Sequence, residues 1–225
     1  MANEASAESG RIPPETKLTA TKQRWAKEGR FLTGRRTQPE GGRLPPGQHE
    51  VRDWPVLDLG LQPDIARDRW QLDITGAVDN PMTLNFGSLA RLPQTSAMSD
   101  IHCVTSWSRY DNRWEGVATR DLLAAVEPRD KASFVLLSSY DGYTTNLSLE
   151  DFAADDALLV HSWNGEPLAR PHGGPIRLVV PRLYFWKSAK WLKAIEFVTA
   201  DRPGFWEVRG YHNRGDPWLE ERYSQ

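Results

Sequence analysis

The chain has 225 residues, 39% of them hydrophobic and 26% charged, so it is long enough to bury one large core or two small ones. A formal net charge of −2 argues against a protein whose whole surface binds nucleic acid. No apolar run approaches the roughly 18 residues that a membrane-spanning helix needs. Arg35 and Arg36 are not followed by the apolar stretch of an export signal. We therefore expect a cytoplasmic protein with no membrane segment and no nucleic-acid partner.

The first fifth of the chain differs in composition from the rest. Residues 1–50 are poor in large apolar side chains and rich in Pro, Gly and charged residues. Such a segment buries too little surface to offset its loss of conformational entropy. We predict an extended or partly disordered N-terminal arm over residues 1–50 and one folded domain over residues 51–225.

Alternating apolar and polar residues predict short strands within this domain. They include strands at 70–74 and 82–86, a strand within 95–104 that leads into Cys103, and a hairpin at 133–149 with its turn at Asp141 and Gly142. Thr119 is expected to cap a helix over 120–126, and Ser148 a brief helix after it. Further apolar strands are expected at 157–163, 176–180 and 194–198. The pattern indicates an α+β protein, a single mixed sheet-rich domain with short helices.

Cys103 is the only cysteine, so it cannot form an intramolecular disulfide. Its neighbours are polar or aromatic, among them His102, Thr105, Trp107 and Trp114. A cysteine that serves packing alone more often has aliphatic neighbours. Packing, nucleophilic catalysis and metal ligation all remain open at this point.

The segment from Pro167 to Ile195 contains no Asp or Glu. Arginine and lysine bind phosphate, and consecutive glycines such as Gly173 and Gly174 let backbone N–H groups approach an anion. Aromatic residues interleaved with these cations could also stack bases of single-stranded nucleic acid, but a pocket for one small anionic ligand is the better interpretation. The six cations of this segment are Arg170, Arg177, Arg182, Lys187, Lys190 and Lys193.

Four ordered motifs resemble the molybdopterin-dependent sulfite oxidase family over about residues 50–215. They are Cys-Val-x-x-Trp-Ser at 103–108, Trp-x-Gly-Val at 114–117, His-Gly-Gly-Pro-Ile-Arg-Leu-Val-Val-Pro at 172–181, and the segment 184–191 with Ser-Ala-Lys-Trp at its end. The chain is most similar to bacterial stand-alone catalytic domains such as the protein-methionine-sulfoxide reductase catalytic subunit. The resemblance implies a sulfite oxidase-type molybdopterin-binding fold.

The resemblance also implies a set of site residues. Cys103 matches the thiolate that ligates molybdenum beside the pterin dithiolene, in keeping with the preference of thiophilic metals for sulfur. Independently of the resemblance, Thr105 and Tyr143 are expected with Cys103 at the catalytic centre, and Trp107 and Tyr211 are further candidates for the substrate face, because hydroxyls and aromatic rings suit a small oxyanion or sulfoxide. Residues implied to contact the molybdopterin, besides Cys103, are Trp54, Leu57, Asp58, Ser139, His172, Arg177, Ser188, Ala189 and Lys190.

These features predict a molybdenum-dependent two-electron oxidoreductase that transfers an oxygen atom to or from a small S- or N-oxide or oxyanion. An electron donor or acceptor outside the chain is required, and no haem is expected in the chain itself. One alternative is a hydrolase with Cys103 as nucleophile and His102, His161 or His172 as base, although neighbouring residues of a strand point to opposite faces, which disfavours His102. The other is a non-catalytic module that holds a pterin or nucleotide.

Overall fold

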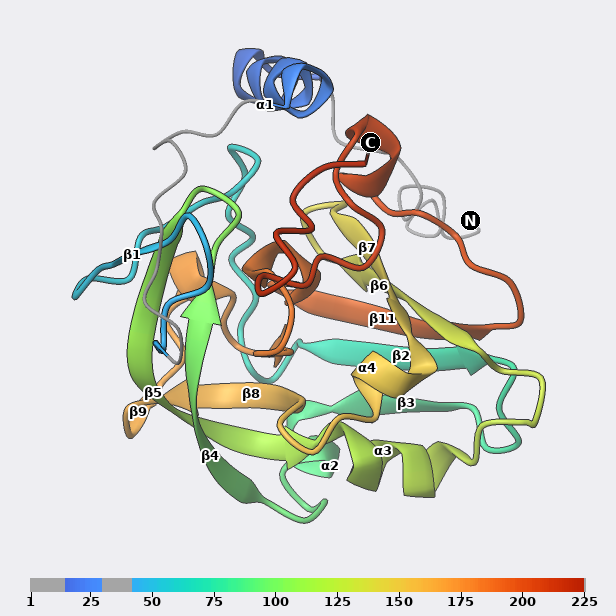
Figure 1. Ribbon diagram of the computed structural model, residues 1–225. Helices are drawn as coiled ribbons and strands as arrows, with labels where there is room; N and C mark the ends of the chain where they lie inside the picture. The colour runs from blue at the N-terminus through green and yellow to red at the C-terminus, as the bar shows by residue number, and fades with distance from the viewer. Residues whose placement is uncertain (1–14, 30–41, 225) are drawn as a thin grey trace, which may run out of the picture.

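The computed structural model describes residues 15–29 and 42–224. The predicted arm therefore lies partly outside the described residues, at 1–14 and 30–41, and the boundary between arm and domain stays a prediction. Within the described part, two β-sheets lie beside each other, with short helices at their edges and α1 (Lys17–Glu28) above them (Figure 1). No helix of the described ranges is long and apolar enough to cross a membrane.

Both sheets are mixed. The first has six strands in the order β1-β5-β8-β10, with β4 paired to β5 and β9 paired to β8. The second has five strands in the order β3-β2-β11-β6-β7. Neighbours are antiparallel except for the β1–β5 and β2–β11 pairs. The strands are β1 (His49–Glu50), β2 (Gln71–Gly76), β3 (Met82–Asn85), β4 (Thr95–His102), β5 (Trp107–Ala118), β6 (Phe134–Ser139), β7 (Thr144–Ser148), β8 (Leu158–Trp163), β9 (Glu166–Pro167), β10 (Arg177–Val179) and β11 (Leu192–Val198).

The alternating patterns form strands because one face of each is buried. In β2, Leu72 and Ile74 are fully buried while Gln71, Asp73 and Thr75 are exposed, and β3, also a predicted strand, pairs antiparallel with it. The predicted hairpin of β6 and β7 is also present, with Gly142 in the left-handed region at φ 83°. The expectation of a mixed, sheet-rich α+β domain is confirmed.

The β4–β5 hairpin positions the single cysteine. Cys103 follows β4 directly, and its N–H donates to the carbonyl of Trp107, with N and O 2.8 Å apart. Ser106 adopts φ 73° and donates its N–H to the Cys103 carbonyl at 3.0 Å, which closes a tight turn. The sequence predicted β4 but not the twelve-residue strand β5 that follows this turn. Cys103 is thus held by backbone hydrogen bonds on both sides of the turn.

The helices are short, and one capping prediction is wrong. The N-cap of α3 is Ala118, which makes no side-chain hydrogen bond, whereas the buried Thr119 hydroxyl donates to the carbonyls of Phe152 and Ala157. Ser148 caps α4 as predicted and accepts the N–H of Asp151 at 3.0 Å. After α1, the helices are α2 (Phe86–Leu89), α3 (Thr119–Val126), α4 (Leu149–Phe152), and the 3₁₀ turns η2 (Arg170–His172), η3 (Phe185–Lys187) and η4 (Glu207–Arg209).

Helix α1 lies inside the segment predicted to be an arm, and the sequence pattern did not predict it. Thr16 and Thr19 form a reciprocal capping box at its N-terminus, and Gly29 ends it in the left-handed conformation at φ 58°. Thr19 and Ala26 are buried against the rest of the molecule. The helix is therefore a packed element, stabilised by its caps and by these few contacts.

Candidate functional site

A cavity opens where the ends of the two sheets meet, and it holds about 830 Å³ of space between protein atoms, part of it open to solvent. All but one of the predicted site residues line this cavity. The exception is Ala189, which is buried outside the lining and whose carbonyl accepts the N–H of Leu178. The predicted residues that line the cavity are Trp54, Leu57, Asp58, Cys103, Thr105, Trp107, Ser139, Tyr143, His172, Arg177, Ser188, Lys190 and Tyr211.

Cys103 is buried in the wall of this cavity, and its sulfur lies 3.1 Å from the hydroxyl oxygen of Thr105. Burial raises the pKa of the thiol, while hydrogen bonds from Thr105 and the charges of Lys22 and Arg222 oppose the rise. Arg222 is itself buried and donates to the carbonyl of Val104 at 2.7 Å. A negatively charged sulfur would therefore meet one hydroxyl and two cations.

Within the described ranges, no three His, Cys, Asp or Glu side chains converge to form a metal-binding group. A metal bound at Cys103 would have one protein sulfur as ligand and would take its other ligands from a cofactor. Soft thiolate ligation suits thiophilic transition metals rather than magnesium or calcium.

Arg177 joins two loops on the opposite wall. Its guanidinium donates to the carbonyls of His172 at 2.8 Å and Ser188 at 2.7 Å, and it lies 4.2 Å from the ring centroid of Phe185. Burial lowers its pKa to about 9. Since a guanidinium carries five N–H donors, donors remain for a ligand after these bonds are made. Arg177 therefore fixes the loops and still presents positive charge to the cavity.

Lys190 and His172 lie beside Arg177. The ammonium of Lys190 donates to the carbonyl of Pro171 at 2.9 Å, and burial, followed by repulsion from Arg177, lowers its pKa to about 8. The His172 ring stacks on Trp54, with centroids 3.9 Å apart and planes within 8°. Burial and these nearby cations lower the His172 pKa to about 4, so the ring is neutral at pH 7. This wall offers cations and a flat, uncharged aromatic pair.

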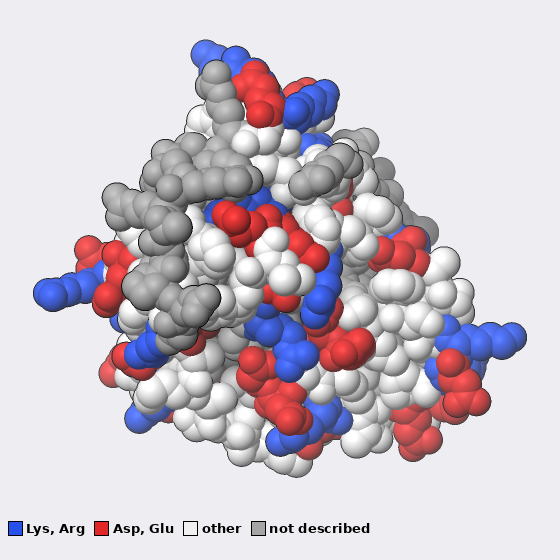
Figure 2. All heavy atoms as spheres, in the orientation of Figure 1, with Lys and Arg blue, Asp and Glu red and all other residues white. Residues whose placement is uncertain are grey.

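Only two of the six cations in the segment 167–195 line the cavity, so the predicted anion site is smaller than the charge pattern indicated. Arg170 and Arg182 face Asp64 and Asp156 instead, at 3.7 Å and 3.6 Å. Lys187 is fully buried and pairs with Glu207 at 2.7 Å. On the face of the molecule in Figure 2, acidic and basic side chains are interspersed rather than gathered by sign.

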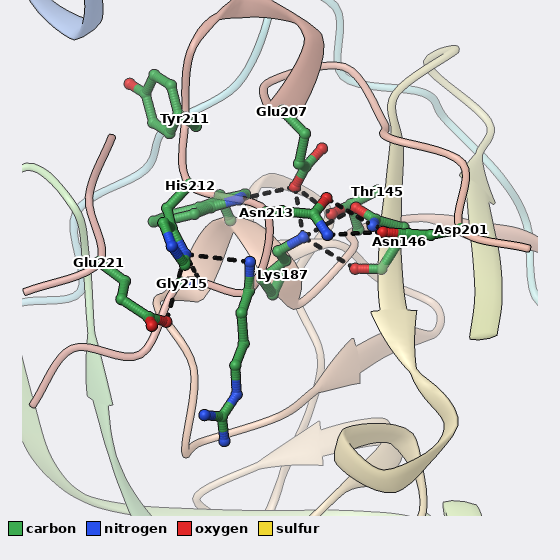
Figure 3. A network of polar contacts seen from close by, with 12 residues as sticks. Thr145, Asn146, Lys187, Asp201, Glu207, Tyr211, His212, Asn213, Gly215 and Glu221 are labelled. Carbon is green, nitrogen blue, oxygen red and sulfur yellow. Dashed lines mark hydrogen bonds and ion pairs between the residues drawn. The ribbon is translucent and has the colours of Figure 1, made fainter. Parts of the chain in front are cut away.

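The Lys187–Glu207 pair belongs to a buried polar network behind the cavity wall (Figure 3). The same Glu207 oxygen accepts from the Thr145 hydroxyl and from the indole N–H of Trp186, both at 2.9 Å. The Tyr143 hydroxyl donates to the Trp186 carbonyl at 2.6 Å. Trp186 and Tyr143 both line the cavity, so the network fixes the position of this part of its wall.

Three further polar residues line the wall, Ser139, Asp141 and Asp58. The buried hydroxyl oxygen of Ser139 has no hydrogen-bond partner among the described residues. Burial raises the pKa of Asp141 to about 6, against the opposing effects of the Tyr143 N–H and Lys190. For Asp58, burial acts to raise the pKa, but hydrogen bonds from Gln62 and the Gly60 N–H, together with the charges of Lys190 and Lys22, lower it overall. A polar ligand in the cavity would satisfy Ser139.

The histidines proposed as bases for a cysteine hydrolase are mostly directed elsewhere. His102 is buried with its Nδ1 2.8 Å from the Ser108 hydroxyl, and it does not line the cavity. His161 contacts Ser162 and Gln94 through its two ring nitrogens. Among these three histidines, only His172 shares the cavity with Cys103. Burial raises the pKa of the Cys103 thiol, whereas an activated cysteine nucleophile has a lowered pKa. This arrangement disfavours an activated cysteine nucleophile.

The sequence missed several lining residues. Lys22, Asp141, Trp186 and Trp206 also face the cavity, and they come from four separate parts of the chain. The ten tryptophans were the one available signal for aromatic walls. Trp70, Trp114 and Trp191 are fully buried in the core. The tryptophans on the cavity wall are Trp54, Trp107, Trp186 and Trp206.

Comparison with known proteins gives consistent results. Residues 59–206 match the family described as oxidoreductase molybdopterin binding domain. The uncharacterized oxidoreductase YuiH of Bacillus subtilis is 46% identical over 190 residues, which cover 84% of this chain and 96% of that protein. The protein-methionine-sulfoxide reductase catalytic subunit MsrP of Campylobacter jejuni is 27% identical over 166 residues, covering 66% of this chain and 56% of MsrP.

A solved structure shares the fold. The sulfane dehydrogenase SoxCD of Paracoccus pantotrophus matches with a TM-score of 0.56 and 22% identity, covering 62% of this chain and 40% of that one. The family match extends over most of the folded domain and includes Cys103, Ser139, Arg177 and Lys190. The chain therefore belongs to the oxidoreductase molybdopterin binding domain family, of the sulfite oxidase type.

Proposed function

We propose that the protein is a molybdenum-dependent two-electron oxidoreductase that transfers an oxygen atom to or from a small oxyanion, S-oxide or N-oxide. The observation that carries this proposal is the single buried sulfur of Cys103 in a cavity whose other wall presents Arg177 and Lys190. One thiolate and a separate cationic wall suit a metal whose remaining ligands belong to an anionic organic cofactor.

The residues of the cavity fit a molybdopterin. Cys103 would ligate the metal, while Arg177 and Lys190 would hold the phosphate of the pterin. The unpartnered Ser139 hydroxyl and the stacked pair of Trp54 and His172 suit a polar, flat heterocycle. When bound, the molybdenum and its dithiolene supply the two-electron redox change and the exchange of the oxygen atom.

The chain itself contributes positioning and exclusion of water. Thr105 hydrogen-bonds to the Cys103 sulfur and so orients it and stabilises its anionic form. Tyr143 is fixed by its bond to the Trp186 carbonyl, and with Tyr211 it closes the substrate side of the cavity. Burial raises the pKa of both phenols, so both remain protonated hydrogen-bond donors at neutral pH. Electrons are supplied or accepted by a partner outside this chain.

Elemental analysis tests the proposal directly. We expect about one molybdenum per chain in protein purified from a host that makes the cofactor. The Cys103→Ser and Cys103→Ala variants should lose the Mo(V) paramagnetic signal of the wild type, while pterin, measured by fluorescence after oxidative release, is retained. Well-folded wild-type protein without molybdenum would refute the assignment, and an unchanged Mo(V) signal in both variants would remove Cys103 from the metal.

A further inference from the structure

Helix α1 contributes one residue to the lining of the cavity. It lies above the C-terminal segments in Figure 1, and its buried Ala26 approaches Gly210 so closely that a Cβ at Gly210 would lie 3.4 Å from the Ala26 Cβ. The helix precedes residues 59–206, the range that matches the family. It is thus an addition to the part of the chain that the family defines.

One side chain of α1 reaches the cavity. Lys22 lines it together with Cys103, Trp206 and Tyr211, and its ammonium lies 5.4 Å from the ring centroid of Trp206. Burial lowers the Lys22 pKa, whereas the negative charges of a Cys103 thiolate and of Asp58 raise it. The ammonium therefore shares an electrostatic environment with the sulfur that we assign to the metal.

Lys22 differs from the other cations of the lining. Arg177 and Lys190 donate to backbone carbonyls at 2.7 Å to 2.9 Å. Over residues 15–29 and 42–224, no hydrogen bond or ion pair joins the Lys22 ammonium to a protein oxygen. A partly buried ammonium without such a partner is costly unless an anion reaches it. The hydrogen-bonding capacity of Lys22 is therefore available to a ligand.

We propose that Lys22 binds the negative charge of the substrate beside Cys103, and that α1 thereby selects a small oxyanion over a neutral S- or N-oxide. This inference deepens the proposed function and rests on it for the identity of the reaction. Arg177 and Lys190 would serve the cofactor, so Lys22 is the one remaining cation among the described residues that line the cavity. The Trp206 and Tyr211 rings next to it limit the size of that substrate.

The charge preference can be measured without the cofactor, because Cys103 is the only cysteine. In cofactor-free protein the thiolate displaces iodide from anionic iodoacetate or from neutral iodoacetamide, forming one C–S bond in each case. The ratio of the two rates cancels any change in thiol pKa or access. Lys22→Met should lower the ratio of iodoacetate to iodoacetamide rates by roughly five- to tenfold, the effect of one nearby charge at intermediate dielectric.

Two variants control this experiment. Lys22→Arg keeps the charge and should keep the wild-type ratio, and Lys17→Met removes an exposed lysine of the same helix and should leave the ratio unchanged. An unchanged ratio in Lys22→Met, or an equal decrease in Lys17→Met, would overturn the inference. Near-ultraviolet circular dichroism of each variant verifies that the tryptophan environment is preserved.

Turnover by the molybdenum-loaded enzyme provides the second measurement. With sulfite as the anionic probe and ferricyanide as acceptor, Lys22→Met should raise KM roughly five- to tenfold and change kcat less than twofold. With neutral dimethyl sulfoxide and reduced viologen, KM should be the same in both proteins. Turnover of the neutral probe alone would refute the inference but leave the proposed function intact. Absence of molybdenum would refute the proposed function, and the alkylation ratio would still decide whether Lys22 binds anions.

Discussion

The hydroxyl oxygen of Thr105 lies 3.1 Å from the sulfur of Cys103, across the turn that joins β4 to β5. The contact opposes the rise in the Cys103 pKa that burial causes. We expect Thr105→Val to raise the thiol pKa further and to slow the reaction of cofactor-free protein with iodoacetamide severalfold at pH 8. Thr105→Ser retains the hydroxyl and should keep the wild-type pH–rate profile. Equal rates for the valine and serine variants would contradict a role for this hydrogen bond.

The buried Lys187–Glu207 pair predicts a large loss of stability when one partner is removed. Lys187→Met leaves the Glu207 carboxylate buried without its cation, and we expect the free energy of unfolding in urea to fall by about 3–5 kcal/mol. Adding Glu207→Gln should restore at least about 1 kcal/mol of that loss. The control is Arg120→Met, which removes the exposed Arg120–Asp155 pair and should cost under about 1 kcal/mol. Similar losses of unfolding free energy in Lys187→Met and Arg120→Met would contradict the expected difference between buried and exposed ion pairs.

Replacing the Asp141 carboxyl by an amide should stabilise the folded protein at pH 7 but not at pH 4. Burial raises its pKa to about 6 in the folded protein, so its contribution favours folding below about pH 4 and is lost as the pH rises through 6. Asp141→Asn removes the titration and keeps an oxygen that can accept the Tyr143 N–H. We expect the variant to be more stable than wild type by about 2–3 kcal/mol at pH 7 and equally stable at pH 4. Urea unfolding at both pH values tests this, with exposed Asp68→Asn as the control for the lost charge.

Alanine substitutions at Gly173 and Gly60 should separate the cost of a left-handed backbone from the cost of a steric contact. It adopts φ +103°, and a Cβ there would lie 2.9 Å from the Cβ of Lys190. Gly173→Ala should cost about 2–3 kcal/mol of unfolding free energy and displace Lys190. Gly60 has a similar φ of +94° with nothing within 4 Å, so Gly60→Ala should show only the backbone effect of about 1 kcal/mol. Equal losses at the two sites would show that the contact with Lys190 contributes nothing.

Sequence alone predicted the elements whose pattern is local. The strands β2, β3 and β6 of the second sheet follow from period-two alternation, because every second side chain of each is the more buried one. The strand β7 was also predicted from alternation, although three consecutive residues of it are buried. The cap at Ser148 follows from a local hydrogen bond to Asp151. Thr119 fits the same capping pattern, yet its hydroxyl bonds to carbonyls more than thirty residues away, which no local rule can anticipate.

The same distinction applies to the cavity. Sequence motifs located nearly all of the predicted lining residues. Lys187 was wrongly counted among the ligand-binding cations, because its partner Glu207 lies 20 residues further along the chain and their pairing is a tertiary contact. Lys22 and Asp141 were missed for the converse reason, since neither stands near a motif. Helix α1 was missed because few of its residues are apolar and only Thr19 and Ala26 are buried, so its stability depends on docking to the rest of the molecule. The cytoplasmic location and the absence of haem stay predictions.

The cavity draws its walls from both sheets, with Cys103 after β4 of the first and Ser139 at the end of β6 of the second. A ligand in the cavity would contact both sheets, which are also joined by hydrogen bonds such as that from the Leu192 N–H to the Ile176 carbonyl, and would add its binding energy to the stability of the whole molecule. Chains made in a cell deprived of cofactor should unfold locally more often where the two sheets meet at the cavity. Intracellular proteases would then remove the empty population selectively, and the steady-state amount of the protein would follow the supply of its cofactor.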